Sequence, residues 1–182
     1  MSRVLVPLAQ GCEELEAITI TDLLVRAGVE VTTAGLDDKP VTASRGARLI
    51  PDTSIDAIRD QVFDLIVLPG GLPGADYLRD NERLQTLLKS HAGEGRYVGA
   101  ICAAPKALAA AGLLSGKKAT AYPGVLEALG DDQIDVKDTA IEIDGNIVTS
   151  RGPGTAMDFA LTLIELLEGP EKRDEVNNQL VR

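Results

Sequence analysis

Short apolar runs alternate with helical patterns along most of the chain. The runs are nearly continuous, as is typical of strands buried on both faces, and they cover residues 4–9, 29–34, 65–68 and 97–101. Apolar residues recur at helical spacing in other segments, which are residues 15–27, 81–92, 105–111 and 157–167. This alternation predicts an α/β fold with a mainly parallel central sheet covered by helices on both faces.

Weaker signals fill the rest of the pattern. Residues 41–49 are short and broken by glycine, and they predict a small hairpin or side ribbon. Residues 119–121 and 141–150 predict further strands, with a turn at Asp144-Gly145, and a short polar helix is expected at the end. We find no internal repeat, linker or domain boundary, so we expect one domain over residues 1–182.

The composition is that of an ordinary soluble globular protein, with 45% hydrophobic and 25% charged residues. The net charge of −10 argues against binding to nucleic acid or to an anionic membrane, because such surfaces need clustered Lys and Arg. The sequence contains no run of about 18 uninterrupted apolar residues, so we expect no membrane span. The first residues are typical of a strand and not of a signal peptide, so we expect a cytoplasmic protein.

The chain contains two cysteines, Cys12 and Cys102, and one histidine, His91. Two cysteines without a C-x-x-C spacing argue against a disulfide framework and against a thiolate zinc site. One imidazole cannot build a histidine-rich metal site, so we expect neither a metal nor a cofactor. His91 falls in the helix predicted over residues 81–92, where we expect it at the solvated surface.

Cys102 follows one of the predicted buried strands, and ligands of open parallel sheets bind at the carboxyl ends of strands. Ala100 and Ala104 are small residues two positions to either side, and Pro105 suits the first turn of the next helix. This pattern predicts a sharp strand-to-helix turn, at which the helix dipole lowers the pKa of the cysteine. A buried structural cysteine would fit the same local sequence.

Glu16 favours the functional interpretation. When the helix over residues 15–27 is projected at about 100° per residue, Glu16 falls within the apolar face and Glu14 points toward solvent. A carboxyl group on a core face loses its hydration, so we expect it to pair or to take a proton. Alternatively, Glu16 could simply complement the helix N-terminus.

A second apolar patch lies on the same predicted helix. It is formed by Leu15, Ile18 and Val25, away from the face that should cover the sheet. A helix that is apolar on two sides packs against two surfaces. The first should be the sheet, and we expect the second to be a partner subunit.

Pro69-Gly70-Gly71 follows another buried strand. Two glycines let the backbone approach a ligand closely, so the amides of Gly71 and Ala103 could together form an oxyanion hole. The alternative is an ordinary Pro-Gly-Gly turn.

Taken together, several motifs resemble the ThiJ/PfpI superfamily over nearly the whole chain. They lie at residues 11–16 (G-x-E-E-x-E), 22–28, 67–71 (V-L-P-G-G), 100–103 (A-I-C-A) and 149–155 (T-S-R-G-P-G-T). The resemblance implies a flavodoxin-like sandwich that forms a homodimer through its first helix. It also implies that Cys102 is the reactive cysteine and Glu16 its protonated partner, with Gly71 and Ala103 as amide donors.

Further residues are implied by the resemblance to line the site. They are Gly70, Arg26, Arg45, Tyr122, Arg151 and Pro153. The segment from Arg151 to Thr155 is implied to lie near the site of a partner subunit. From the sequence alone, this segment is a helix start, with Thr155 and Asp158 spaced as a capping box.

At two positions this chain lacks a histidine that relatives in the superfamily carry, which limits the reactions we expect. Ala103 stands where protease-like relatives carry His, and Tyr122 stands where some close relatives carry His. We therefore do not expect a Cys–His dyad, a peptidase or a glutamine amidotransferase.

Two functions remain. In the first, the Cys102 thiolate attacks a reactive dicarbonyl such as methylglyoxal, or its adduct on an amine or thiol, while Glu16 transfers the proton. In the second, the protein is a non-enzymatic stress sensor or chaperone in which Cys102 oxidises to a sulfinate. Cys12 could be a second oxidisable thiol. The same residues serve both functions, so the sequence does not separate them.

Overall fold

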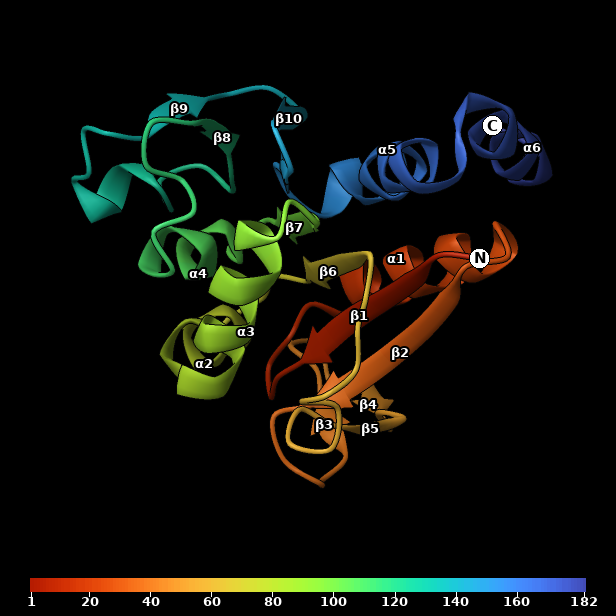
Figure 1. Ribbon diagram of the computed structural model, residues 1–182, viewed down its shortest axis with the longest axis horizontal. Coiled ribbons are helices and arrows are strands. Elements are labelled where there is room, and N and C mark those ends of the chain that lie inside the picture. The colour runs from red at the N-terminus through yellow and green to blue at the C-terminus, as the bar shows by residue number, and fades with distance from the viewer.

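The computed structural model describes residues 1–182 and contains one large sheet with helices on both faces (Figure 1). The strands of this sheet are β1 (Arg3–Leu8), β2 (Glu30–Gly35), β5 (Thr53–Ser54), β6 (Leu65–Leu68), β7 (Tyr97–Ile101), β10 (Ile141–Asp144) and β11 (Ile147–Ser150). Two smaller strand pairs are β3 (Val41–Thr42) with β4 (Arg48–Leu49), and β8 (Lys118–Thr120) with β9 (Asp135–Lys137). The helices are α1 (Glu14–Arg26), α2 (Gly74–Asp80), α3 (Glu82–Gly93), α4 (Pro105–Ala110), α5 (Ala156–Glu168) and α6 (Pro170–Gln179), with single 3-10 turns η1 (Glu127–Leu129) and η2 (Pro153–Thr155).

The large sheet has seven strands in the order β10-β11-β7-β6-β1-β2-β5. All its pairings are parallel except that of β10 with β11, which form an antiparallel hairpin. The structure therefore confirms the expected flavodoxin-like α/β sandwich with a mainly parallel sheet. The turn at Asp144-Gly145 and the side ribbon, which is the pair β3–β4, are confirmed as well.

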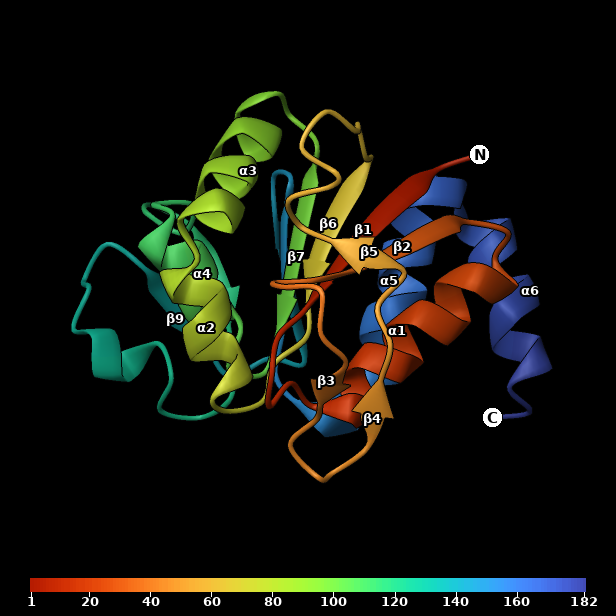
Figure 2. The ribbon, with the colours of Figure 1, turned by 90° about the horizontal axis from the view of Figure 1, so that it is seen from below.

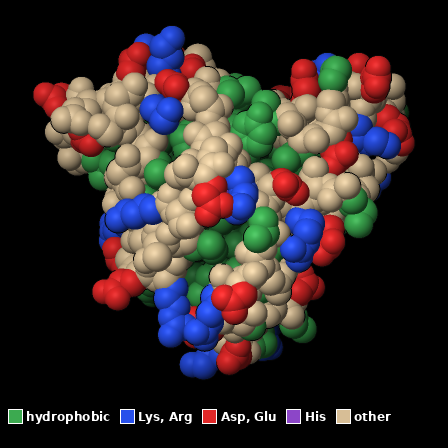
Figure 3. All heavy atoms as spheres, in the orientation of Figure 1, with side chains coloured by type: hydrophobic (Ala, Val, Ile, Leu, Met, Phe, Trp, Pro, Cys, Tyr) green, Lys and Arg blue, Asp and Glu red, His purple; other side chains and the backbone are tan.

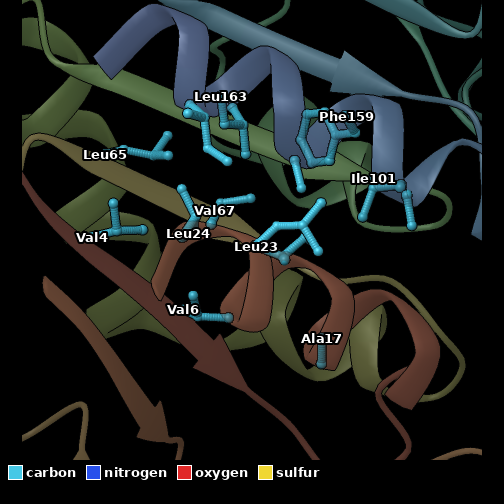
Figure 4. Packing of buried hydrophobic residues seen from close by; sticks show 14 of the residues in the cluster. Val4, Val6, Ala17, Leu23, Leu24, Leu65, Val67, Ile101, Phe159 and Leu163 are labelled. Atoms are coloured by element: carbon cyan, nitrogen blue, oxygen red, sulfur yellow. The ribbon is translucent and has the colours of Figure 1, made fainter. Parts of the chain in front are cut away.

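Two apolar layers cover the sheet because successive residues of a strand point to opposite faces. Val4 and Val6 of β1 face the layer of α1 and α5, where Leu24 and Phe159 pack (Figure 4). Leu5 faces the other layer, which is formed with α2, α3 and α4. Figure 2 shows α1, α5 and α6 on one side of the sheet and the three other helices on the opposite side.

The strand order reverses at β1, which has β2 on one side and β6 on the other. Ligands of open α/β sheets bind at such a reversal, outside the carboxyl ends of the strands. The turn after β1 and the loop after β6 meet at this point, where the amide of Glu13 donates to the carbonyl of Gly70 at 2.8 Å. The turn after β7, which carries Cys102, lies beside Gly70.

His91 is buried, with 3% of its surface exposed, so the prediction that it is solvated is wrong. It lies on the same face of α3 as Leu84 and Leu88, at helical spacing, and this face covers the sheet. Its Nε2 atom lies 2.9 Å from the carbonyl oxygen of Tyr97 at the start of β7. Burial lowers the pKa of His91, so the imidazole is a neutral core group.

The predicted capping box of Thr155 with Asp158 is also wrong. The Thr155 hydroxyl accepts the amide of Gly152 at 3.1 Å and lies 2.7 Å from the Ser150 hydroxyl. Its side chain makes no capping bond to α5. The Thr155 hydroxyl instead caps the 3-10 turn η2 at Gly152, three residues earlier, because this turn precedes the α-helix.

Charged side chains of both signs are interspersed over the face of the molecule in Figure 3. None of the helices combines the length and the apolar composition needed to cross a bilayer.

Candidate active site at Cys102

Cys102 occupies a sharp turn between β7 and α4. Its φ angle is +64°, in the left-handed region that residues other than glycine and asparagine rarely adopt. The turn is held on both sides, because the Cys102 amide donates to the carbonyl of Ser150 at 3.0 Å and its carbonyl accepts the amide of Tyr122 at 2.8 Å. The sequence prediction of a strand-to-helix turn at this residue is confirmed, and 8% of the surface of Cys102 is exposed.

Gly70 explains why the turn needs small neighbours. A Cβ atom at Gly70 would lie 2.7 Å from the Cβ of Cys102 and 2.9 Å from the amide nitrogen of Ala103. Both distances are shorter than any ordinary contact, so the loop after β6 reaches the cysteine only because residue 70 has no side chain. Ala104 is fully buried on the other side of the turn.

Glu16 lies in the first turn of α1 and is fully buried. Its Oε2 atom accepts the amide of Gly70 at 2.7 Å. The other oxygen, Oε1, has no partner with hydrogen-bond geometry, and the Cys102 thiol is the side chain with which the carboxyl interacts. Burial raises the pKa of Glu16 to about 7, against the opposing effects of the Gly70 amide and the thiol. The predicted placement of Glu16 on a core face is confirmed.

When Glu16 is charged, the pKa of Cys102 is raised to about 12. The sequence prediction that the helix dipole lowers the pKa of this thiol is therefore wrong for that state. Burial is the main cause, and repulsion by the Glu16 carboxylate adds to it. The amides of Ala103 and Gly71 act on the sulfur in the opposite direction. A thiolate beside a protonated Glu16 has the same total charge without the repulsion, so the two groups hold one negative charge between them.

Gly71 brings its amide to the sulfur by a backbone path that only glycine can follow. Its φ angle is +89°, and a Cβ atom there would lie 2.4 Å from the amide nitrogen of Glu13. The turn after β1 therefore packs directly against Gly71. The amide of Ala103, the residue after the cysteine, approaches the same sulfur.

Cys12 lies in the turn between β1 and α1 and is completely buried. Its pKa is raised to about 12, mainly by burial and in addition by the carboxylates of Glu14 and Glu13. Both cysteines are free thiols. Sequence reasoning treated Cys12 as a second oxidisable thiol, but it is shielded from solvent.

The side ribbon is tied to the same turn through Glu14, which the sequence placed in solvent. The Glu14 carboxylate accepts the amides of Arg45 at 2.9 Å and Ala47 at 3.3 Å, and the Ser44 hydroxyl at 3.1 Å. Partial burial opposes ionisation, but these hydrogen bonds prevail and lower the pKa of Glu14. Arg45 is thereby held beside the Cys12–Glu13 turn. The sequence around Glu14 does not predict this contact, because its partners lie at least 30 residues further along the chain.

The remaining predicted lining residues fall into two groups. Tyr122 and Arg151 lie beside the Cys102 turn, since the Tyr122 amide donates to the Cys102 carbonyl and the Arg151 guanidinium donates to the carbonyl of Ala121 at 3.3 Å. Pro153 begins the 3-10 turn η2, two residues after Arg151. Arg26 lies at the far end of α1 and pairs with Asp22 at 2.7 Å. Ten residues of helix separate it from Glu16, about 15 Å at the α-helical rise, so a single chain does not bring it to Cys102.

The patch formed by Leu15, Ile18 and Val25 is exposed in the single chain, at 50%, 51% and 60%. Exposed apolar groups in one stripe of a helix are typical of an interface. A homodimer remains a prediction.

A surface cavity of about 520 Å³ lies elsewhere. It is lined mostly by charged and polar residues of the segment before β6 and of α3, including Arg59, Glu82 and Arg83. The structure brings no group of three metal-ligating side chains together.

The model of the DJ-1/PfpI family matches residues 2–166. The chain belongs to the DJ-1/PfpI family. Protein DJ-1 homolog A of Arabidopsis thaliana is 47% identical over 98% of this chain, which spans 46% of that relative's length. Glutathione-independent glyoxalase DJR-1.2 of Caenorhabditis elegans is 37% identical over 92% of this chain and 89% of its own. The crystal structure of Drosophila melanogaster DJ-1beta has a TM-score of 0.95 at 43% identity, with 100% of this chain and 98% of that one covered.

Proposed function

We propose that this DJ-1/PfpI protein is a cysteine-dependent enzyme that converts α-oxoaldehydes such as methylglyoxal into α-hydroxy acids without glutathione. The same site would act on the adducts that these dicarbonyls form with amines and thiols. The observation that carries the proposal is a strained cysteine, Cys102, next to a fully buried carboxyl, Glu16, whose pKa is raised to about 7. The glyoxalase name of the C. elegans relative supports this class of chemistry.

In the first step the sulfur of Cys102 attacks the aldehyde carbon. A carbon–sulfur bond forms and the carbonyl π electrons move to the oxygen, which the amides of Gly71 and Ala103 stabilise. Before the attack, the protonated Glu16 carboxyl stabilises the thiolate as a donor. After it, Glu16 gives its proton to the oxyanion, which leaves a neutral hemithioacetal and a carboxylate.

In the second step the Glu16 carboxylate takes the proton from the former aldehyde carbon and returns it to the neighbouring carbon, while the hydroxyl proton of the hemithioacetal passes to the oxygen of that neighbouring carbon. The first carbon is oxidised and the second is reduced by the same number of electrons, so no external redox partner is needed. Water then cleaves the resulting thioester, which releases the α-hydroxy acid and restores the thiol.

A peptidase mechanism lacks its base. The imidazole of His91 lies at the start of β7, against the Tyr97 carbonyl, and Cys102 follows the other end of this strand. At the usual rise of a strand the two residues are about 16 Å apart. The distance of His91 and the closeness of the Glu16 carboxyl support Glu16 as the group that moves protons at this thiol.

The direct test measures lactate formed from methylglyoxal in the absence of glutathione. Wild type and Cys12→Ser should both form lactate, because Cys12 is buried away from substrate, and Cys102→Ser should lose activity by about 10²-fold or more. Wild-type rates in Cys102→Ser would contradict the proposal, as would a wild-type protein that turns over no dicarbonyl.

A second function, redox sensing, is favoured by the carboxyl donor beside Cys102, which keeps 8% of its surface exposed whereas Cys12 keeps none. One peroxide molecule would convert the thiolate to a sulfenate and water, and a second would give the sulfinate, which Glu16 could stabilise as a donor. A chaperone role controlled by this oxidation belongs to the same alternative. Intact-mass measurement after peroxide treatment tests it: a gain of two oxygen atoms at Cys102, with no dicarbonyl turnover, would favour the sensor. The proposal in either form assigns the protein to the cytoplasm as a homodimer.

A further inference from the structure

Tyr122 is a large side chain beside the Cys102 turn, where the cysteine otherwise meets the buried Glu16 carboxyl and three small residues. These are Gly70, Gly71 and Ala103, and none of them offers a side chain larger than a methyl group to the rest of a substrate. The amide of Tyr122 donates to the Cys102 carbonyl at 2.8 Å, so its backbone is adjacent to the reacting residue. The mechanism proposed above gives the tyrosine side chain no role.

The ring of Tyr122 lies over Gly152. A Cβ atom at Gly152 would lie 3.4 Å from the ring atom Cδ2 and 4.0 Å from Cε2, so the ring rests on glycine backbone. Gly152 comes two residues after Ser150, whose carbonyl accepts the Cys102 amide. The ring therefore borders the carboxyl ends of β7 and β11, which is the edge of the sheet where substrate must enter.

The backbone that carries the ring is fixed on both sides. Cys102 holds it from one side, and the Arg151 guanidinium donates to the carbonyl of the preceding residue, Ala121, at 3.3 Å. The Tyr122 carbonyl also accepts the amide of Val125 at 3.0 Å and closes a turn. The backbone is anchored in this way, and 52% of the residue is exposed. An exposed aromatic ring on a fixed backbone is available to stack on a ligand at little cost in backbone ordering.

We propose that Tyr122 is a specificity-determining residue that favours α-oxoaldehydes carrying a flat apolar group, such as an aryl ring, on the ketone carbon. The inference rests on the proposed function of the Cys102 site. The aldehyde carbon would meet the sulfur, and the aryl group would pack on the ring of Tyr122. Methylglyoxal, which carries only a methyl group there, would gain little from this contact.

The test compares kcat/KM for phenylglyoxal with kcat/KM for methylglyoxal, from initial rates. In Tyr122→Leu the ratio of the two values should fall by roughly 3- to 10-fold, the usual scale of one aromatic pair. Tyr122→Phe keeps the ring and should keep the ratio. Tyr77→Leu is the matched control, because Tyr77 is an equally exposed tyrosine (49%) on α2 and should leave the ratio unchanged.

The outcomes separate the two proposals. A wild-type protein that turns over neither compound overturns the proposed function. Turnover of both with an unchanged ratio in Tyr122→Leu overturns the role of Tyr122 alone, and so does an equal loss in Tyr122→Phe, which would assign the effect to the hydroxyl. The wild-type chain offers an independent check, since the aryl product mandelate should inhibit at several-fold lower concentration than lactate. Equal inhibition by the two acids would also contradict the inference.

Discussion

Cys102 and Cys12 are both buried thiols, and burial raises the pKa of each to about 12. They differ in their neighbours. Cys12 faces the carboxylates of Glu13 and Glu14, which both accept the Ser44 hydroxyl of the side ribbon, and hydrogen bonds lower the pKa of Glu14. Cys102 faces Glu16, a carboxyl that burial allows to become neutral, and two amides that donate toward its sulfur. We therefore expect a buried thiol to act as a nucleophile only where an adjacent carboxyl group can be neutral.

The largest effect should come from removing the proton of Glu16. Glu16→Gln keeps a hydrogen-bond donor but cannot transfer a proton, so dicarbonyl turnover should fall by about 10²-fold or more. Glu16→Leu removes the donor too, and the rate of sulfinate formation at Cys102 should then fall as well. Full turnover in Glu16→Gln would show that no proton passes through this residue and would favour the sensor function.

The raised pKa of Glu16 also predicts a pH dependence of stability. The folded state holds this proton up to about pH 7, whereas an unfolded glutamate loses it near pH 4.5, so the folded state gains stability below pH 4.5. The advantage is lost as the pH rises to 7. Relative to Glu16→Gln, the free energy of unfolding of the wild type should fall by about 3 kcal/mol over this range, at about 1.4 kcal/mol per unit. Parallel curves from urea unfolding of the two proteins would contradict the shift.

These two predictions depend on a site that could be largely predicted from the sequence. Cys102, Glu16 and Gly70 were found because the end of a buried strand, an apolar helix face and a Pro-Gly-Gly turn are local patterns. The burial of His91 and the contacts of Glu14 could not be found, since they depend on which distant segment packs against each residue. The lowered pKa expected for Cys102 was wrong because the helix dipole is weaker than burial plus a neighbouring charge.

In the fold, too, the elements with strong local sequence patterns could be predicted and those fixed by distant contacts could not. Strands β1, β6 and β7 and helix α1 were predicted because their apolar patterns are long or continuous. β5 and β9 were missed, having only two and three residues, and α2 was missed because it begins at a glycine after Leu72-Pro73. Short elements of this kind are fixed by the strands and loops against which they pack.

Gly70→Ala should show how closely the loop after β6 is fitted to the Cys102 turn. The added methyl group would overlap the Cys102 Cβ and the Ile101 carbonyl oxygen, at 2.7 and 2.8 Å, so unfolding free energy should fall by about 1–3 kcal/mol. Gly93→Ala is the matched control in α3, where a methyl group meets nothing within 4 Å, and it should be neutral or slightly stabilising. Equal stability of the two variants in urea would mean that the turn tolerates a side chain at residue 70.

A substitution in the exposed apolar patch of α1 should have the smallest effect on the reactivity of the two thiols. Ile18→Asp should dissociate the predicted homodimer, because it places a charge among the exposed apolar residues Leu15 and Val25. Sedimentation equilibrium would show this as a shift toward the 19.2 kDa monomer. A wild-type protein that is already monomeric at micromolar concentration would refute the dimer, and an unchanged dimer in the variant would locate the interface elsewhere.

The most direct test of the Cys102–Glu16 pair is site-resolved alkylation by iodoacetamide from pH 5 to 9, with each cysteine followed by peptide mass. We predict that Cys102 reacts far faster than Cys12 and that its rate levels off above about pH 7, where the pair has lost its first proton. In urea both cysteines should react alike, as ordinary thiols of pKa about 8.5. A Cys102 rate that climbs tenfold per pH unit up to pH 9, or equal rates at the two cysteines in the folded protein, would contradict the account.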